Sequence, residues 1–175
     1  MLELLMMTRD EAVGLMDDRR LPARFRGILL AEGALGPLVV RESAFDRFLD
    51  GDDWYWCAER LIYCPKLGLI VGSFCFKNMP QHQNGQVEIG YGIAPACRKQ
   101  GYATEAVALM AAEAFRHSEV NALTADTLEL NSASIRVLEK NGFQRVGERY
   151  DEEDGALIEW RKVSDRIPGA ETRRR

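Results

Sequence analysis

The stretch 87–101 constrains the fold more than any other part of the sequence. Over 87–93, apolar residues alternate with Glu88 and two glycines, which predicts a strand with one packed face and one nearly bare face. Pro95 ends that strand, and a short basic loop leads into a helix predicted over 102–117. A strand, a tight loop and a helix in this order are typical of a sheet with helices packed on it.

The flanking patterns extend this unit into a mixed α/β fold. Thr8 and Glu11 form a capping box that predicts a helix start, and Gly142 is placed to end a later helix. Further strands are predicted over 2–6, 54–63, 69–77, 122–127, 143–150 and 156–163, and further helices over 43–49 and 131–140. Because helices alternate with strands only in the second half, we expect a mixed sheet with helices on both faces.

Length and composition predict one globular domain. The chain has 175 residues, of which 46% are hydrophobic, and a formal net charge of −4. We expect a single domain over 1–165 and a flexible C-terminal tail over 166–175. An acidic chain argues against a nucleic-acid partner, which would need a basic face.

The termini and the cysteines indicate a cytoplasmic protein without a membrane segment or a metal. No apolar run approaches the roughly 20 residues of a membrane-spanning helix, and 1–7 reads better as a strand than as a signal peptide. The cysteines stand apart with no CxxC pair and are interpreted as free thiols: Cys57, Cys64, Cys75 and Cys97. With only two histidines in the chain, we expect no metal site.

Gly101 stands at the predicted mouth of a helix, directly after Arg98 and Lys99. The first turn of a helix has backbone N–H groups without intrahelical partners, and its dipole is positive there. A glycine allows an anion to approach these amides closely, as in pyrophosphate sites. The alternative is a plain strand-to-helix turn whose basic pair is solvated.

The loop and the helix after it carry a family resemblance. The run 98–103, Arg-Lys-Gln-Gly-Tyr-Ala, fits the [R/Q]-x-x-G-x-[G/A] signature of the GNAT N-acetyltransferases. Asn131 with Ser134, and the run 137–143, resemble the RimJ/RimL-like subgroup that acetylates ribosomal-protein N-termini. The resemblance is strong over 72–161 and weak before that, and three motifs in the right order are more specific than one.

The resemblance implies a GNAT-like fold, with a mostly antiparallel sheet whose middle strands splay, and acetyl-CoA as the cosubstrate. It places the pantetheine arm against the backbone of Tyr91, Gly92 and Ile93. The pyrophosphate would lie on the amides of the loop, with basic side chains beside it: Gln100, Gly101, Tyr102 and Ala103 for the amides, and Arg98 and Lys99 for the charges. Asn131 would contact the pantetheine, and a simple helix cap is its alternative role.

Acetyl transfer to an amine requires a base, an oxyanion site and an acid. Glu88 is the only acid on the bare strand face and is the candidate base; an exposed carboxylate or a buried ion-pair partner is the alternative. A backbone N–H near Ile93 would stabilise the oxyanion, as the family implies. Many relatives have a tyrosine as acid where this chain has Leu138, so Ser134 is the candidate replacement, or else a packing or capping serine. This departure leaves a second hypothesis open, a non-catalytic acyl-CoA-binding or sensor module.

The acceptor is predicted only as a primary amine, either a protein N-terminus or a small molecule. The acidic run 151–154 is interpreted as a solvated turn, with a contact to the amine as the alternative. Trp54, Tyr55 and Trp56 either line the acceptor pocket or pack in the core. A homodimer is compatible with the sequence, which leaves the oligomeric state open.

Overall fold

The computed structural model describes residues 1–18, 23–35 and 53–165. The predicted helix over 43–49 and the tail over 166–175 lie outside these residues. The strands are β1 (Glu3–Met6), β2 (Leu29–Leu30), β3 (Arg60–Cys64), β4 (Leu69–Phe76), β5 (Gln86–Ile93), β6 (Ala122–Leu128), β7 (Gln144–Asp151) and β8 (Gly155–Val163). The α-helices are α1 (Arg9–Asp18), α3 (Trp54–Cys57), α4 (Tyr102–Ala114) and α5 (Ser132–Lys140).

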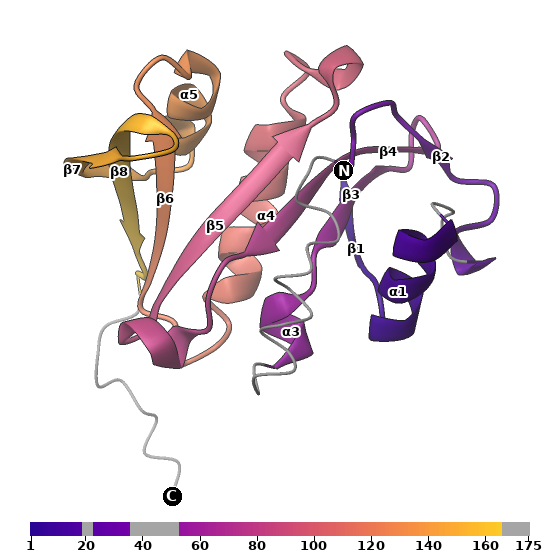
Figure 1. The fold of residues 1–175 in the computed structure, drawn as a ribbon, viewed down its shortest axis with the longest axis horizontal. Helices are drawn as coiled ribbons and strands as arrows, with labels where there is room; N and C mark the ends of the chain where they lie inside the picture. Colours follow the sequence, from indigo (N-terminus) through magenta and orange to yellow (C-terminus); the bar gives the residue numbers. More distant parts are fainter. Residues whose placement is uncertain (19–22, 36–52, 166–175) are drawn as a thin grey trace, which may run out of the picture.

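These strands form one eight-stranded sheet in the order β1-β3-β4-β5-β6-β8-β7, with β2 paired to β4. Neighbouring strands in this order are antiparallel except for the central pair, β5 and β6, which is parallel. Figure 1 shows β5 and β6 diverging from a common lower end, so that the sheet opens like a V in its middle. The predicted mixed, mostly antiparallel fold with splayed middle strands is confirmed.

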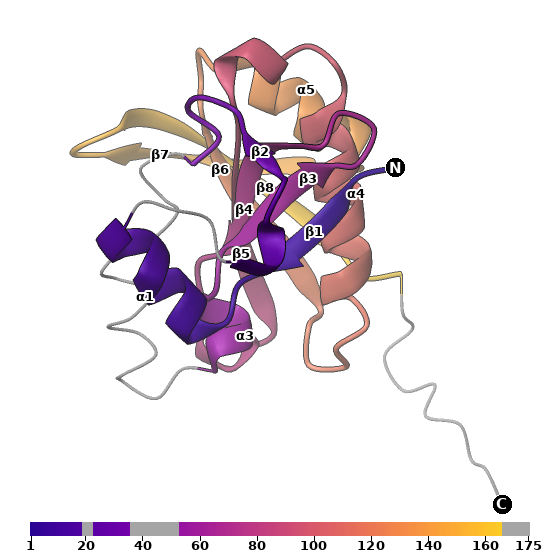
Figure 2. The ribbon, with the colours of Figure 1, turned by 90° about the vertical axis from the view of Figure 1, so that its right-hand side faces the viewer.

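Helices cover both faces of the sheet. Figure 2 shows α4 and α5 on one side and α1 on the other. The helix α4 presents small and apolar side chains to the sheet, and Ala106, Val107, Met110 and Ala114 are all fully buried. Small residues allow a helix to lie close to strands, which fixes the first turn of α4 relative to the end of β5.

Local signals position the helices as predicted in most cases. The Thr8 hydroxyl accepts from the Glu11 amide at 3.3 Å and the Glu11 carboxylate accepts from the Thr8 amide at 2.8 Å, completing the capping box of α1. Gly142, with φ +76°, follows the end of α5. Residues 54–57 form a short helix, so the prediction of a strand from 54 was wrong. The cause is Asp53, whose side chain accepts from the Tyr55 amide at 2.8 Å and caps a helical turn.

Within the described residues, no helix is long and apolar enough to cross a membrane. In the same part of the chain, no group of three or more His, Cys, Asp or Glu side chains is placed to hold a metal ion. None of the four cysteines, all of them described, forms a disulfide.

Candidate active site

The second half of β5 has an open backbone edge, because only its first residues pair with β6. The β5–β6 ladder has three residue pairs and ends at Glu88–Thr124, although β5 continues to Ile93. On the other side, the Lys77 amide donates to the Glu88 carbonyl at 2.9 Å. In an antiparallel ladder, alternate residues direct their backbone groups to opposite sides. The N–H and C=O groups of Tyr91 and the N–H of Ile93 therefore face the gap between β5 and β6.

This open edge forms one wall of a cavity of about 720 Å³. The other walls are the loop and first turn of α4 and one face of α5. Its lining residues include Tyr91, Gly92, Ile93, Arg98, Lys99, Gly101, Tyr102, Ala103, Asn131 and Ser134. Ten of the twelve residues singled out from the sequence thus lie around one cavity. The other two are Gln100, whose side chain accepts a hydrogen bond from the Tyr102 phenol at 3.3 Å, and Glu88.

The loop before α4 holds its shape through unusual backbone angles. Gly101 caps the helix with φ +86°, and Lys99 has φ +63°. Both values lie in the left-handed region, where glycine is favoured over other residues. The Arg98 guanidinium donates from Nε to the Ile93 carbonyl at 3.1 Å, which ties the loop to the end of β5. The amides of the first helical turn consequently open into the cavity beside the end of the strand.

The opposite wall is the helix α5, which begins with a side-chain cap. The Asn131 side chain accepts from the Ser134 amide at 3.1 Å, so the predicted helix-cap role of Asn131 is seen directly. The Tyr91 phenol reaches from β5 toward this turn and donates to the Ser134 carbonyl at 3.4 Å. Burial raises the pKa of Tyr91 to about 12, so the phenol stays protonated at neutral pH.

The cavity is strongly cationic. Arg98, Lys99, Arg136 and Lys140 line it, and none of its lining residues is acidic. The chain as a whole carries a formal net charge of −4. Positive charge is therefore concentrated around the helix mouth, where a helix dipole adds to it. This arrangement suits a ligand with several phosphate groups.

Comparison with known families identifies the family of this chain. The acetyltransferase (GNAT) domain family matches residues 35–144, more than half of the chain. The chain belongs to the GNAT acetyltransferases. A curated relative, the uncharacterized N-acetyltransferase p20 of Bacillus licheniformis, is 32% identical over 92 residues, which cover 51% of each protein. The chain thus spans about half the length of the curated relative that it matches.

Solved structures share the fold of this GNAT protein along most of its length. Ribosomal-protein-S5-alanine acetyltransferase from Vibrio fischeri has a TM-score of 0.65 and 16% identity, over 94% of this chain and 93% of that one. The ribosomal alpha-N-protein acetyltransferase RimL, solved with coenzyme A, has a TM-score of 0.65 and 15% identity, over 94% of both chains. Aminoglycoside acetyltransferase AAC(6')-Ib, solved with coenzyme A and kanamycin, has a TM-score of 0.51 and 19% identity, over 61% of this chain and 66% of that one.

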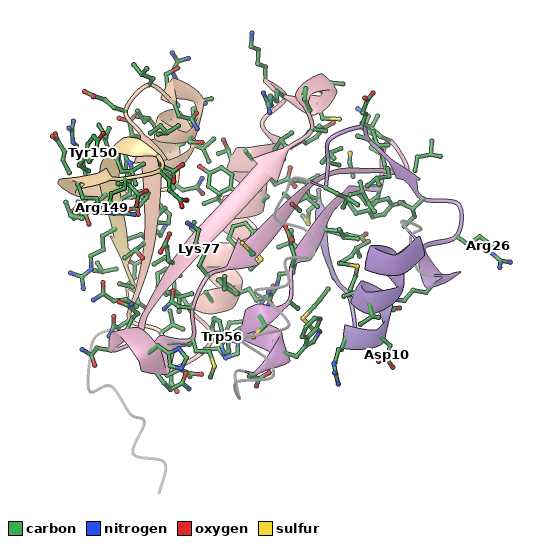
Figure 3. All side chains as sticks on the ribbon, viewed as in Figure 1. Asp10, Arg26, Trp56, Lys77, Arg149 and Tyr150 are labelled. Atoms are coloured by element: carbon green, nitrogen blue, oxygen red, sulfur yellow. The ribbon has the colours of Figure 1, made fainter. Side chains whose placement is uncertain are left out.

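Glu88 lies on the other face of the GNAT sheet from the cavity. Tyr91 faces α5, and because side chains alternate along a strand, Glu88 faces the opposite side. Its Oε1 is 2.5 Å from the Lys77 ammonium nitrogen. The side chains of Lys77 and Glu88 are 44% and 32% exposed, so Glu88 is a half-exposed ion-pair partner and not the buried one considered as an alternative to the base. In Figure 3, Lys77 lies over the middle of the sheet. The base candidate Glu88 and the acid candidate Ser134 therefore lie on opposite faces of the sheet.

The acidic turn 151–154 is built around its first residue. One oxygen of Asp151 accepts from the backbone amides of Glu153 and Asp154, at 3.0 and 3.1 Å. The other accepts from Arg149 at 3.0 Å, and this guanidinium lowers the pKa of Asp151. The carboxylate of Asp151 thus makes its hydrogen bonds within its own hairpin, which is consistent with a turn.

The three aromatic residues of α3 use their side chains for structure. Trp56 is 3% exposed within the core, and the Trp54 indole donates to the Met7 carbonyl at 3.0 Å. The Tyr55 phenol donates to Glu113 of α4 at 2.6 Å. These contacts favour core packing, the second of the two roles considered for them.

Sequence reasoning missed three features of the cavity. It used Tyr91 only for its backbone, although the alternation along β5 places its phenol on the packed face. It also missed Arg136 and Lys140, which line the cavity on α5. Their spacing of four residues, in a helix that begins at a candidate ligand residue, was the available signal.

Proposed function

We propose that this protein is an N-acetyltransferase that transfers an acetyl group from acetyl-CoA to a primary amine by direct attack. One observation carries the proposal: a single cavity joins the open edge of β5 to the cationic mouth of α4. An extended amide chain such as pantetheine needs the first feature and a pyrophosphate needs the second. The reaction assigned to the family requires both in one ligand.

The donor substrate would lie across these elements in a fixed direction. The pantetheine amides pair with the free backbone groups of Tyr91 and Ile93, beside the cap residue Asn131. The pyrophosphate lies on the amides of 100–103, with Arg98 and Lys99 adjacent. Charge complementarity supports this placement, because coenzyme A has about four negative charges, two of them on a terminal phosphomonoester.

The chemistry then requires groups from both faces of the sheet, at the gap between β5 and β6. The nitrogen lone pair of the neutral amine attacks the thioester carbon, and the Ile93 N–H donates to the developing oxyanion. The amine nitrogen loses its proton to Glu88 through water, the C–S bond breaks, and the departing sulfur takes a proton. Ser134 or the Tyr91 phenol supplies that proton, since both line the cavity.

The alternative function is a module that binds acyl-CoA without turnover. Two observations favour it: Lys77 occupies the carboxylate of Glu88, and Leu138, at the position where many relatives have a tyrosine, is fully buried in the core. The two functions differ in the response to substitution. If Glu88→Gln and Ser134→Ala leave the rate of thiol release unchanged while coenzyme A still binds, the binding module is the better account.

The donor site is tested by calorimetry on Gly101→Glu with Gly27→Glu as its control. Both glycines have left-handed backbone angles, φ +86° and +89°, and open space at the Cβ position. The strain and the added charge are therefore matched, but only Gly101 lies at the cavity. We expect Gly101→Glu to abolish binding of acetyl-CoA and Gly27→Glu to retain it. Equal affinities for both variants would remove the cavity as the donor site.

The acceptor is tested by release of free thiol from acetyl-CoA in the presence of an amine panel. The panel contains peptides with free alanine and serine N-termini, an aminoglycoside and a polyamine, because these amine classes are the ones that the proposal leaves open. Release that depends on one class of amine identifies the acceptor. Binding of acetyl-CoA without release from any class favours the binding module.

A further inference from the structure

Arg136 and Lys140 form a pair of free cations on the cavity side of α5. They are four residues apart, so their side chains are neighbours on one face of the helix. Both are exposed and both line the cavity. Neither side chain has a hydrogen bond or an ion pair with another residue in the described part of the chain. Like charges at this spacing destabilise a helix slightly, although Lys140 in the last turn of α5 also interacts favourably with the helix dipole.

The direction of α5 separates this pair from the pantetheine end of the cavity. The first turn of α5, at Asn131 and Ser134, lies beside Tyr91 of β5. The end of the helix lies against the first turn of α4, where the Asn141 amide donates to the Thr104 carbonyl at 3.2 Å. With a rise of about 1.5 Å per residue, Arg136 lies roughly 7.5 Å and Lys140 roughly 13 Å along the helix from Asn131. Both cations therefore lie beyond the first turn of α5 in the direction of the mouth of α4, and Lys140 is the nearer of the two to it.

Coenzyme A has two separate phosphate groups, and the loop accounts for one of them. Under the proposed function, the amides of 100–103 together with Arg98 and Lys99 hold the pyrophosphate, which has two negative charges. The 3′-phosphomonoester adds roughly two more, since its second pKa is near 6. The cations left over in the cavity lining are Arg136 and Lys140, which belong to α5 and not to the loop.

We propose that Arg136 and Lys140 bind the 3′-phosphate of the donor, so that this protein selects coenzyme A over 3′-dephospho-coenzyme A. The inference rests on the proposed function, because it assumes that the cavity holds the donor. It adds a specificity determinant on α5, outside the signature loop. A phosphomonoester between two cations forms charge-assisted hydrogen bonds, which are stronger than neutral ones.

The test is calorimetric titration of coenzyme A and of 3′-dephospho-coenzyme A into three proteins. These are the unsubstituted chain, the double variant Arg136→Gln/Lys140→Gln and the control Arg26→Gln/Arg116→Gln. The control removes the same number of charges from exposed arginines outside the cavity lining. Figure 3 shows Arg26 at the far side of the molecule from the β7–β8 hairpin. Both variants lose two positive charges. A difference in their affinity for coenzyme A therefore cannot come from the net charge of the protein alone.

We expect the unsubstituted chain and the control to bind coenzyme A about tenfold or more tightly than the dephospho form. In the double variant this ratio falls to near one, while the affinity for the dephospho form stays within about twofold of the original. Equal losses for both ligands would overturn the proposal, because the pair would then act on the pyrophosphate. A ratio near one in the unsubstituted chain would also overturn it. Absence of binding for both ligands in the folded, unsubstituted chain would instead contradict the proposed function.

Discussion

Gly72 of β4 allows the end of β5 to lie in its present position. A Cβ atom at residue 72 would be 2.1 Å from the Gly92 carbonyl oxygen and 2.9 Å from Cδ1 of Ile93. Both of these residues line the cavity. The substitution Gly72→Ala therefore tests whether the close approach of two strands shapes the donor site.

The magnitude follows from the geometry of this contact. Real Cβ contacts are essentially never below 3.0 Å, so the backbone at Gly92 must move by about 1 Å. Overpacking of this kind costs roughly 1–3 kcal/mol of the free energy of unfolding. Alanine in place of glycine stabilises the strand by about 0.5–1 kcal/mol, because the unfolded chain has less conformational entropy. The clash is the larger effect, so we expect the free energy of unfolding to fall. We also expect the affinity for acetyl-CoA to fall by about tenfold, corresponding to 1.4 kcal/mol.

Urea unfolding and calorimetric titration of acetyl-CoA measure the two effects. Gly14→Ala is the matched control, because a Cβ at residue 14 of α1 meets nothing within 4 Å. Helix propensity predicts that this variant is more stable by up to about 1 kcal/mol, with unchanged affinity. If Gly72→Ala kept both the stability and the affinity of the original chain, the reasoning about β4 and β5 would be refuted.

Three further predictions concern single side chains. Glu88→Gln should lower kcat by about 100-fold with little change in the KM for acetyl-CoA, and an unaltered pH–rate profile would remove Glu88 from the mechanism. Leu138→Ala should lower the free energy of unfolding by about 2–5 kcal/mol, because the side chain is fully buried; a urea midpoint equal to the original would contradict this packing. Burial raises the pKa of Tyr91 to about 12 from 10, so its contribution to stability is present below pH 10 and is lost as the pH rises to about 12. Tyr91→Phe should weaken that alkaline loss in urea unfolding, and an identical pH dependence would count against the buried phenol.

The unit around β5 and α4 was predictable because local signals agree there. Alternation over 87–93, the proline after it and the glycine at the helix mouth each specify the same strand, loop and helix. The capping pair Thr8 and Glu11 likewise required no knowledge of the rest of the chain. In α3 the local signals conflicted, since a run of aromatic residues favours a strand and the side chain of Asp53 favours a helical turn.

The features that sequence reasoning left open or missed depend on contacts between distant segments. The ion pair of Glu88 with Lys77 follows from the register of β4 against β5, which no local pattern specifies. The cavity position of Arg136 and Lys140 depends on how α5 lies against the first turn of α4. Packing of this kind is set by the core as a whole. The family resemblance therefore suggested a ligand from the sequence, whereas the residues that line the cavity could be named only from the structure.

The central claim is that one donor molecule lies along the open edge of β5 and the mouth of α4. Hydrogen–deuterium exchange with and without acetyl-CoA measures this directly, since bound amides exchange more slowly. The account predicts slower exchange over 89–103 and 131–140 on addition of acetyl-CoA, with unchanged exchange in the hairpin over 144–163. Unchanged exchange over 89–103 at saturating acetyl-CoA, or protection confined to the hairpin, would contradict it.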